Sequence, residues 1–158
     1  MILILFYLVT SFVILMDQLS KHWIRSSLQV GETIEVWEGV LNFTHFQNSG
    51  AAFGWFEGYG RLFVPVAIII AVLSVYMLKK GFIYGKLLEI GVALFVGGAI
   101  GNAIDRTIFN RVTDFIHFQF DDGILNLADF ALVFGVFLLL VDSLIIDAIK
   151  KRREIYQK

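Results

Sequence analysis

Four long apolar segments restrict the fold of this chain more than any other feature. A helix needs about 20 residues to cross the roughly 30 Å hydrocarbon core of a bilayer. The runs that reach or approach this length are 1–16, 62–78, 90–104 and 124–149. Of the 158 residues, 58% are hydrophobic and 17% are charged, which is more apolar than a soluble domain. We predict one all-α membrane domain, residues 1–158, with transmembrane helices at about 1–24, 61–79, 86–105 and 126–148.

The first apolar run has an alternative interpretation as a cleaved secretory signal. Such signals begin with a positively charged stretch and end at a small-x-small cleavage site. No Lys or Arg precedes the run at 1–16, and no such site follows it. We therefore interpret this run as the first transmembrane helix.

The basic residues indicate the orientation of the helices. Eight of the 13 Lys and Arg residues lie in the hairpin after the second helix and in the C-terminal tail. They are Lys79, Lys80, Lys86, Lys150, Lys151, Arg152, Arg153 and Lys158. Because cytoplasmic loops carry the excess of positive charge, both termini are predicted to be cytoplasmic, and segments 23–61 and 105–125 are predicted to face outward.

The first outer segment, at 28–60, is too long for a simple connector. Within it, TIEVW at 33–37 and LNFTHF at 41–46 largely alternate apolar and polar residues, which predicts a small β-hairpin at the outer surface. Asn48, Gly50, Ala51 and Ala52 follow this hairpin. We interpret these small residues as a flap whose backbone approaches a substrate and whose Asn contacts it; a tight turn is the alternative.

Four acids are expected to converge on the outer face. Asp17 ends the first helix, Asp105 ends the third, Asp114 lies in the second outer segment and Asp129 is in the first turn of the fourth helix. Asp142 is 13 residues beyond Asp129, about 20 Å along the helix, and is therefore not assigned to this cluster.

Two of these acids also have purely structural interpretations. Asp17 and Lys21 are spaced i, i+4, which suits an ordinary helical ion pair as well as a functional one. Asn126 is a favourable N-cap, and an acid three residues later resembles a capping box. Both interpretations remain open from the sequence.

The stretch GGAIGNAIDR at 97–106 combines glycines with polar residues. Gly97 and Gly101 form a GxxxG pair, which favours close approach of another helix. Gly98, Asn102 and Asp105 fall on one helical stripe, which carries an amide and a carboxylate into the bundle. Polar groups at this depth in a membrane indicate function.

Paired carboxylates are the chemistry that best fits this composition. The chain has no cysteine, which excludes disulfides and thiolate nucleophiles, and His22, His45 and His117 lack metal-ligand spacing. A net charge of -1 gives no sign of a nucleic-acid partner. Two carboxylates that share one proton can act as base and acid in peptide hydrolysis.

A small proton-coupled transporter or channel is the rival hypothesis, since intramembrane acids also mark ion pathways. A pathway requires polar residues through the middle of the spans. The segments 65–75 and 91–100 offer only Ser74 as a polar side chain, which favours the enzyme.

Five ordered motifs resemble the bacterial lipoprotein signal peptidase (signal peptidase II) family. They are DQxxK at 17–21, NxGAAF at 48–53, GGxxGNxxDR at 97–106, V-x-DF at 112–115 and NxAD at 126–129. Thr113 and Leu125 depart from the commonest form, in which Val and Phe occupy these positions. Neither departure replaces a carboxylate.

The resemblance implies a mechanism, a site and a location. It makes Asp114 and Asp129 the catalytic pair of an aspartic endopeptidase, which removes the signal peptide from prolipoproteins just before a diacylglyceryl-modified lipobox cysteine. Residues expected to orient the acids or bind substrate are Asp17, Lys21, Asn48, Gly50, Asn102, Asp105, Arg106 and Asn126. Neither metal nor cofactor is expected. The protein is expected to be a monomer among the lipids of the bacterial inner membrane, with its site at the outer face.

Overall fold

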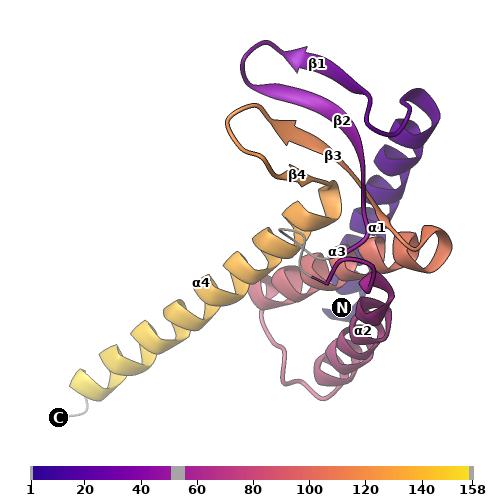
Figure 1. Ribbon diagram of the computed structural model, residues 1–158. Helices are drawn as coiled ribbons and strands as arrows, with labels where there is room; N and C mark the ends of the chain where they lie inside the picture. Colours follow the sequence, from indigo (N-terminus) through magenta and orange to yellow (C-terminus); the bar gives the residue numbers. More distant parts are fainter. Residues whose placement is uncertain (1, 51–55, 157–158) are drawn as a thin grey trace.

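Four long helices form the body of the computed structural model, which describes residues 2–50 and 56–156. They are α1 (Ile2–Ser27), α2 (Phe63–Lys79), α3 (Lys86–Phe109) and α4 (Leu127–Tyr156). Each is long and apolar enough to cross a membrane, α2 together with the 3₁₀ turn Gly60–Leu62 that precedes it. The predicted four-helix membrane fold is confirmed, and Figure 1 shows the arrangement.

Three helices run further than the sequence analysis expected. The third was expected to end near residue 105, where polar side chains begin, but α3 continues to Phe109. The helix ends at Asn110, a left-handed residue (φ 60°) whose N–H donates to the Arg106 carbonyl. Asp105 is fully buried, so its polar side chain marks a protein interior rather than the end of the helix. Helices α1 and α4 likewise extend past their predicted ends.

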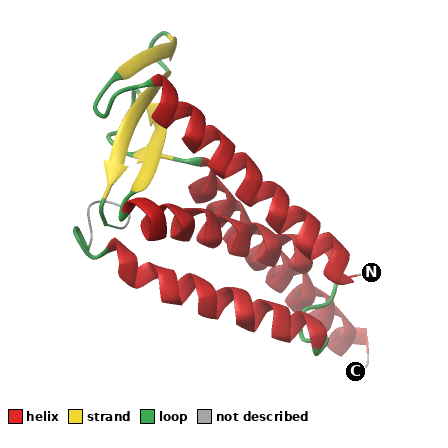
Figure 2. Ribbon diagram, turned by 90° about the vertical axis from the view of Figure 1, so that its right-hand side faces the viewer, coloured by secondary structure: helices red, strands yellow, loops and turns green. Residues whose placement is uncertain are grey.

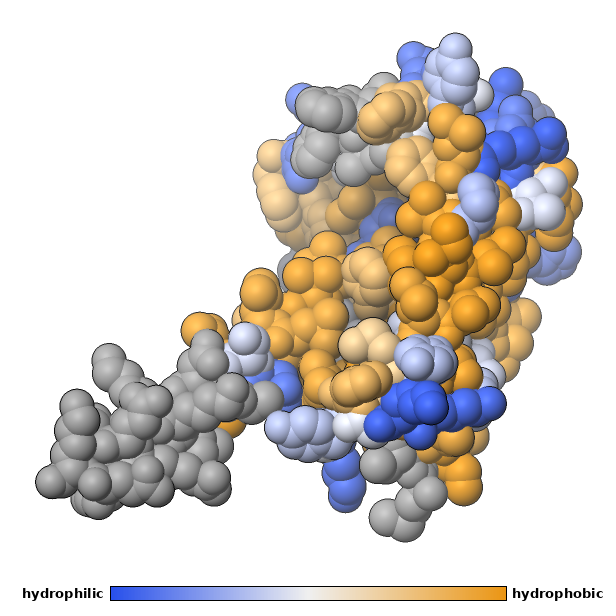
Figure 3. All heavy atoms as spheres, turned by 90° about the horizontal axis from the view of Figure 1, so that it is seen from below, coloured by the Kyte–Doolittle hydropathy of each residue, from blue (hydrophilic) through white to orange (hydrophobic). Residues whose placement is uncertain are grey.

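Helix α3 is the centre of the bundle. In the most apolar stretch of α3, 56% is buried, against 17% in the corresponding stretch of each of the other three helices. Helices α1, α2 and α4 all pack on α3. Large apolar side chains on the three helices that surround α3 remain exposed, such as Leu8 at 64%, Val72 at 62% and Val133 at 67%. Figure 3 shows this hydrophobic surface across the middle of one face, the pattern expected where lipid is the solvent.

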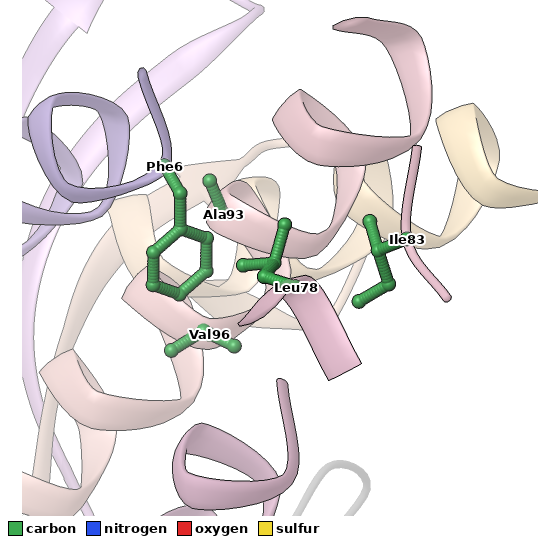
Figure 4. Packing of buried hydrophobic residues seen from close by; sticks show 5 residues of the cluster. All are labelled: Phe6, Leu78, Ile83, Ala93 and Val96. Carbon is green, nitrogen blue, oxygen red and sulfur yellow. The ribbon is translucent and has the colours of Figure 1, made fainter. Parts of the chain in front are cut away.

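A compact apolar cluster joins three helices at the end of the bundle that carries the termini. It comprises Phe6, Leu78, Ile83, Ala93 and Val96 (Figure 4). Close packing of such side chains fixes α1 and α2 against α3. This end of the bundle therefore provides a rigid base for the opposite end.

A four-stranded antiparallel sheet covers the other end. Its order is β1 (Thr33–Trp37), β2 (Leu41–Asn48), β3 (Val112–Phe118) and β4 (Ile124–Leu125). The predicted hairpin is β1–β2; strands β3 and β4, from the second outer segment, were not predicted. In Figure 2 the sheet lies at one end of the helices and both termini at the other.

A bulge in β2 attaches this sheet to α1. The pairing with β3 shifts between Phe43 and Phe46, and a bulge of this kind redirects side chains. His45, within the bulge, is buried and its ring Nδ1 donates to the Leu28 carbonyl at 2.8 Å. Ile24, Leu28 and Phe115 form a second buried cluster at the same joint. Strand β3 is thus held firmly at the C-terminal end of α1.

Candidate active site

The four acids lie together beneath the sheet, as expected. Asp17 comes from α1, Asp105 from α3, Asp114 from β3 and Asp129 from the first turn of α4. Asp17 and Asp105 are 0% exposed and Asp114 is 2% exposed, whereas Asp129 is half-buried. Hydrogen bonds join these side chains to one another through amides and a lysine.

Asn126 links Asp114 to Asp129. Its backbone N–H donates to the Asp129 carboxylate at 3.1 Å, and its side-chain oxygen accepts the Asp129 N–H at 3.1 Å. This is the reciprocal capping box that the spacing suggested. The other end of the same amide donates to Oδ1 of Asp114. Capping and orientation of the acids are therefore two roles of one side chain.

Burial dominates the electrostatics of Asp114. Desolvation, and next the negative charge of Asp129, raise the pKa of Asp114 from 3.8 to about 7. Hydrogen bonds from Asn126 and Asn48, the latter at 3.1 Å to Oδ2, favour the ionised form and limit this rise. At neutral pH this carboxyl group can therefore hold or release a proton.

A relay of polar groups connects Asp129 to α1. Asn102 donates to Oδ1 of Asp129 at 2.9 Å, and its own oxygen accepts from Lys21 Nζ at 2.9 Å. Lys21 is fully buried and forms an ion pair with Asp17 at 2.8 Å. The predicted i, i+4 pair is thus present, and it lies inside the acid cluster rather than on a surface.

Asp17 and Asp105 each hold the backbone immediately before another acid. Asp17 Oδ1 accepts the N–H of Ala128, which precedes Asp129, at 3.0 Å. Asp105 Oδ2 accepts the N–H of Thr113, which precedes Asp114, at 2.9 Å. Charge-assisted hydrogen bonds of this kind are among the stronger ones. Asp17 and Asp105 therefore fix the chain segments that carry Asp129 and Asp114.

Glycines allow α3 to come close to both neighbouring helices. A Cβ at Gly98 would collide with the Ala128 carbonyl of α4, and one at Gly101 would lie 2.6 Å from the Asp17 carboxylate of α1. These close approaches let Asp17 of α1 bond to the backbone of α4 and Asn102 of α3 bond to Asp129. The predicted close packing at this stretch is confirmed.

Arg106 and Asn48 hold the segment that follows β2. Arg106 Nη2 donates to the Gly50 carbonyl at 2.9 Å, and its guanidinium lies 5.2 Å from the centre of the Phe63 ring. Asn48 Oδ1 accepts the Gly50 N–H at 2.9 Å. Ala51 and Ala52 of the predicted flap lie outside the described residues. The described part of the flap is thus bonded to Asp114 through Asn48.

The sequence analysis left three residues of this network without a role: Gln18, Arg25 and Thr113. Gln18 Nε2 bonds to both Asp17 and Asp105, and Arg25 Nη1 contacts Asp105 and Thr113. Arg25 continues the i, i+4 stripe of Asp17 and Lys21, a signal that could have found it. Among the described residues, no group of three or more His, Cys, Asp or Glu is placed to hold a metal ion.

Fold and site together define a multi-pass membrane protein with an acid cluster beneath a small sheet at one end of the bundle. The chain belongs to the signal peptidase II family, because the family model described as Signal peptidase (SPase) II matches residues 9–145. It is similar to lipoprotein signal peptidases from Staphylococcus aureus strains MRSA252 and JH9. Each is 35% identical over 151 residues, which cover 94% of this chain and 93% of the relative.

Two solved structures share the fold. They are described as bacterial membrane enzyme structures determined by the in meso method, at 2.3 Å and 1.9 Å resolution. Both are 34% identical to this chain and cover 88% of it, with TM-scores of 0.82 and 0.79. The alignments cover 87% and 92% of the two solved chains. No comparison supports the transporter alternative.

Proposed function

We propose that this membrane peptidase removes the signal peptide from diacylglyceryl-modified prolipoproteins by an aspartic mechanism. Cleavage falls just before the lipid-modified lipobox cysteine. The observation that carries the proposal is the Asp114–Asn126–Asp129 arrangement, in which one amide bonds to both acids at the sheet end of a membrane bundle. Membership of the signal peptidase II family supplies the substrate class.

In the proposed reaction the two acids have different roles. Asp129 takes a proton from water, and the water oxygen attacks the scissile carbonyl carbon while protonated Asp114 donates a hydrogen bond to the carbonyl oxygen. The tetrahedral intermediate then breaks its C–N bond as Asp129 passes the proton that it took from water to the leaving nitrogen, which returns both acids to their starting states. The raised pKa of Asp114 suits the acid role, and the helix N-terminus favours negative charge on Asp129. No metal, cofactor or covalent intermediate takes part.

The surrounding residues orient this pair and receive the substrate. Asn102 and Asn126 donate to the acids, and Asp17, Lys21 and Asp105 hold the donors and the backbone in place. Asn48, Gly50 and Arg106 form the proposed substrate side. Arg106 already binds one backbone carbonyl, that of Gly50, and a substrate carbonyl is the same kind of acceptor.

The location follows from the substrate. A lipid-modified peptide stays in the membrane, so a site at the outer interface of the bacterial inner membrane, open sideways to lipid, can receive it. The basic hairpin Lys79, Lys80 and Lys86 favours cytoplasmic termini, which supports a location of the sheet and the acids at the outer face. We propose that the enzyme acts as a monomer.

Cleavage of defined peptides tests this proposal. The purified enzyme in bicelles receives a lipobox peptide with a diacylglyceryl cysteine and the same peptide without the lipid, and mass spectrometry locates the cut. The proposal expects cleavage before the modified cysteine only, unaffected by EDTA and absent in Asp114→Asn. Cleavage of both peptides alike would contradict the substrate class, and loss of activity with EDTA would contradict the metal-free mechanism.

A further inference from the structure

We propose that Arg25, acting through Thr113, is a positioning residue for Asp114. The inference rests on the proposed role of Asp114 in catalysis. Arg25 lies near the outer end of α1, and Thr113 is the residue immediately before Asp114 in β3. The contacts of Arg25 link α1 and β3 to the end of α3.

Three residues from two elements, β3 and α3, hold the Arg25 guanidinium. Nη1 donates to Thr113 Oγ1 at 3.0 Å and lies 3.4 Å from both carboxylate oxygens of Asp105. The guanidinium carbon lies 4.6 Å from the centre of the Phe109 ring, in the last turn of α3. The planar guanidinium of arginine carries five donors, so it can bond to a carboxylate and a hydroxyl and also lie over an aromatic face.

Thr113 is therefore held at two points. Asp105 accepts its backbone N–H and Arg25 donates to its side chain, and the residue is only 4% exposed. The next residue is Asp114, so these bonds limit movement of the backbone from which its carboxyl group projects. Small displacements of a catalytic group cost much rate, about 100-fold for 1 Å.

Charge neutralisation alone does not account for Arg25. Asp105 already has a second cation, since Lys21 Nζ lies 4.0 Å from it. Lys21 makes its own hydrogen bonds to Asp17 and Asn102, on the side of the cluster that leads to Asp129. The contribution particular to Arg25 is the bond to Thr113.

Four single variants and the double variant Arg25→Met/Thr113→Val test the proposal. Arg25→Met removes the donor, Thr113→Val removes the acceptor with little change of shape, and Thr113→Ser keeps it. Arg111→Gln is the matched control, because Arg111 lies just before β3 but is exposed and bonds to Gln47 instead. Initial rates with the diacylglyceryl peptide give kcat and KM separately, and thermal unfolding of each preparation gives its Tm.

Loss of positioning should lower kcat and leave KM nearly unchanged. We expect Arg25→Met and Thr113→Val each to lower kcat about tenfold, the effect of one lost hydrogen bond. Thr113→Ser should restore most of the rate. Because both changes remove the same bond, the double variant should be little worse than either single one. Arg111→Gln should behave like wild type.

Wild-type kcat in Thr113→Val would overturn the proposal, as would losses that Thr113→Ser shares or that track Tm alone. If Arg25→Met does not fold, the Thr113→Val and Thr113→Ser pair decides the question. Wild-type cleavage and inactive Asp114→Asn, measured in the same assay, separate failure of this inference from failure of the proposed function.

Discussion

The side-chain amide of Asn126 donates a hydrogen bond to Asp114 while its oxygen accepts the backbone N–H of Asp129. One residue thus begins α4 and bridges the acid pair, by which we mean Asp114 and Asp129. The two roles use different atoms, so substitutions can separate them. Helix capping depends on the oxygen, whereas orientation of Asp114 depends on the nitrogen.

Replacement of Asn126 should separate stability from activity. Serine is also a good N-cap but cannot donate to Asp114 in the same way, so Asn126→Ser should keep the Tm and lower kcat about tenfold, as expected when the hydrogen bond that orients Asp114 is lost. Asn126→Ala should lose activity and also about 1 kcal/mol of stability. Equal activity of Asn126→Ser and wild type would remove the bridge from the mechanism.

The pH dependence of cleavage should report the protonation of Asp114. Its carboxyl group must carry a proton to polarise the substrate carbonyl, and its pKa is raised to about 7. The rate should therefore fall as the pH rises through about 7. Site-resolved infrared spectra should show Asp114 protonated near pH 6; an ionised Asp114 at that pH would exchange the roles within the acid pair.

The same raised pKa predicts a stability change. The unfolded chain releases the Asp114 proton near pH 4, whereas the folded protein keeps it to about pH 7. Because the folded state binds more protons over this window, the contribution of Asp114 lowers stability as the pH rises from about 4 to 7. The Tm of Asp114→Asn should depend less on pH than that of wild type. Parallel pH curves for the two proteins would contradict the raised pKa.

Lys21 should matter chiefly as a buried cation. Removing one partner of a buried ion pair leaves an uncompensated charge, so Lys21→Met should destabilise the protein by about 3–5 kcal/mol. Asp17→Asn added to Lys21→Met removes that charge and keeps an oxygen for the Ala128 N–H, so the double variant should regain part of the Tm. A double variant less stable than Lys21→Met alone would contradict this interpretation.

Gly98 should be intolerant of even one added methyl group. A Cβ there meets the Ala128 carbonyl and lies 2.9 Å from the Leu132 side chain, so Gly98→Ala should displace the start of α4 and with it Asp129. We expect a loss of about 1–3 kcal/mol and at least a tenfold lower kcat. Gly123→Ala is the control, since its Cβ would find only contacts of 3.7 Å or more. Wild-type kinetics in Gly98→Ala would show that α4 can adjust.

Patterns local in the sequence predicted most of the fold. Apolar runs gave the four helices, and alternation gave the β1–β2 hairpin. Strand β3 was missed because its pairing with β2 joins segments more than 60 residues apart, such as Phe46 and Asp114. Helix ends were misplaced where polar residues turned out to be buried, as at Asp105.

The site was predictable as a set of residues but not as a network. Asp17, Asp105, Asp114 and Asp129 could be placed at one end of the bundle from topology alone. The choice of Asp114 and Asp129 as the reacting pair came from the family resemblance and stays a prediction. No sequence rule could show that Asp17 and Asp105 bind the backbone before those two acids, since such bonds depend on packing among three helices and a sheet.

The central claim, that Asp114 and Asp129 act as one catalytic unit, is tested most directly by the turnover of three variants. Asp114→Asn, Asp129→Asn and the double variant should each show no detectable cleavage of the diacylglyceryl peptide. The double variant should be no worse than either single one, because groups that act as a unit are not additive. Binding of the uncleaved peptide should largely survive in all three. Near wild-type turnover in either single variant would remove that acid from the mechanism and contradict the account.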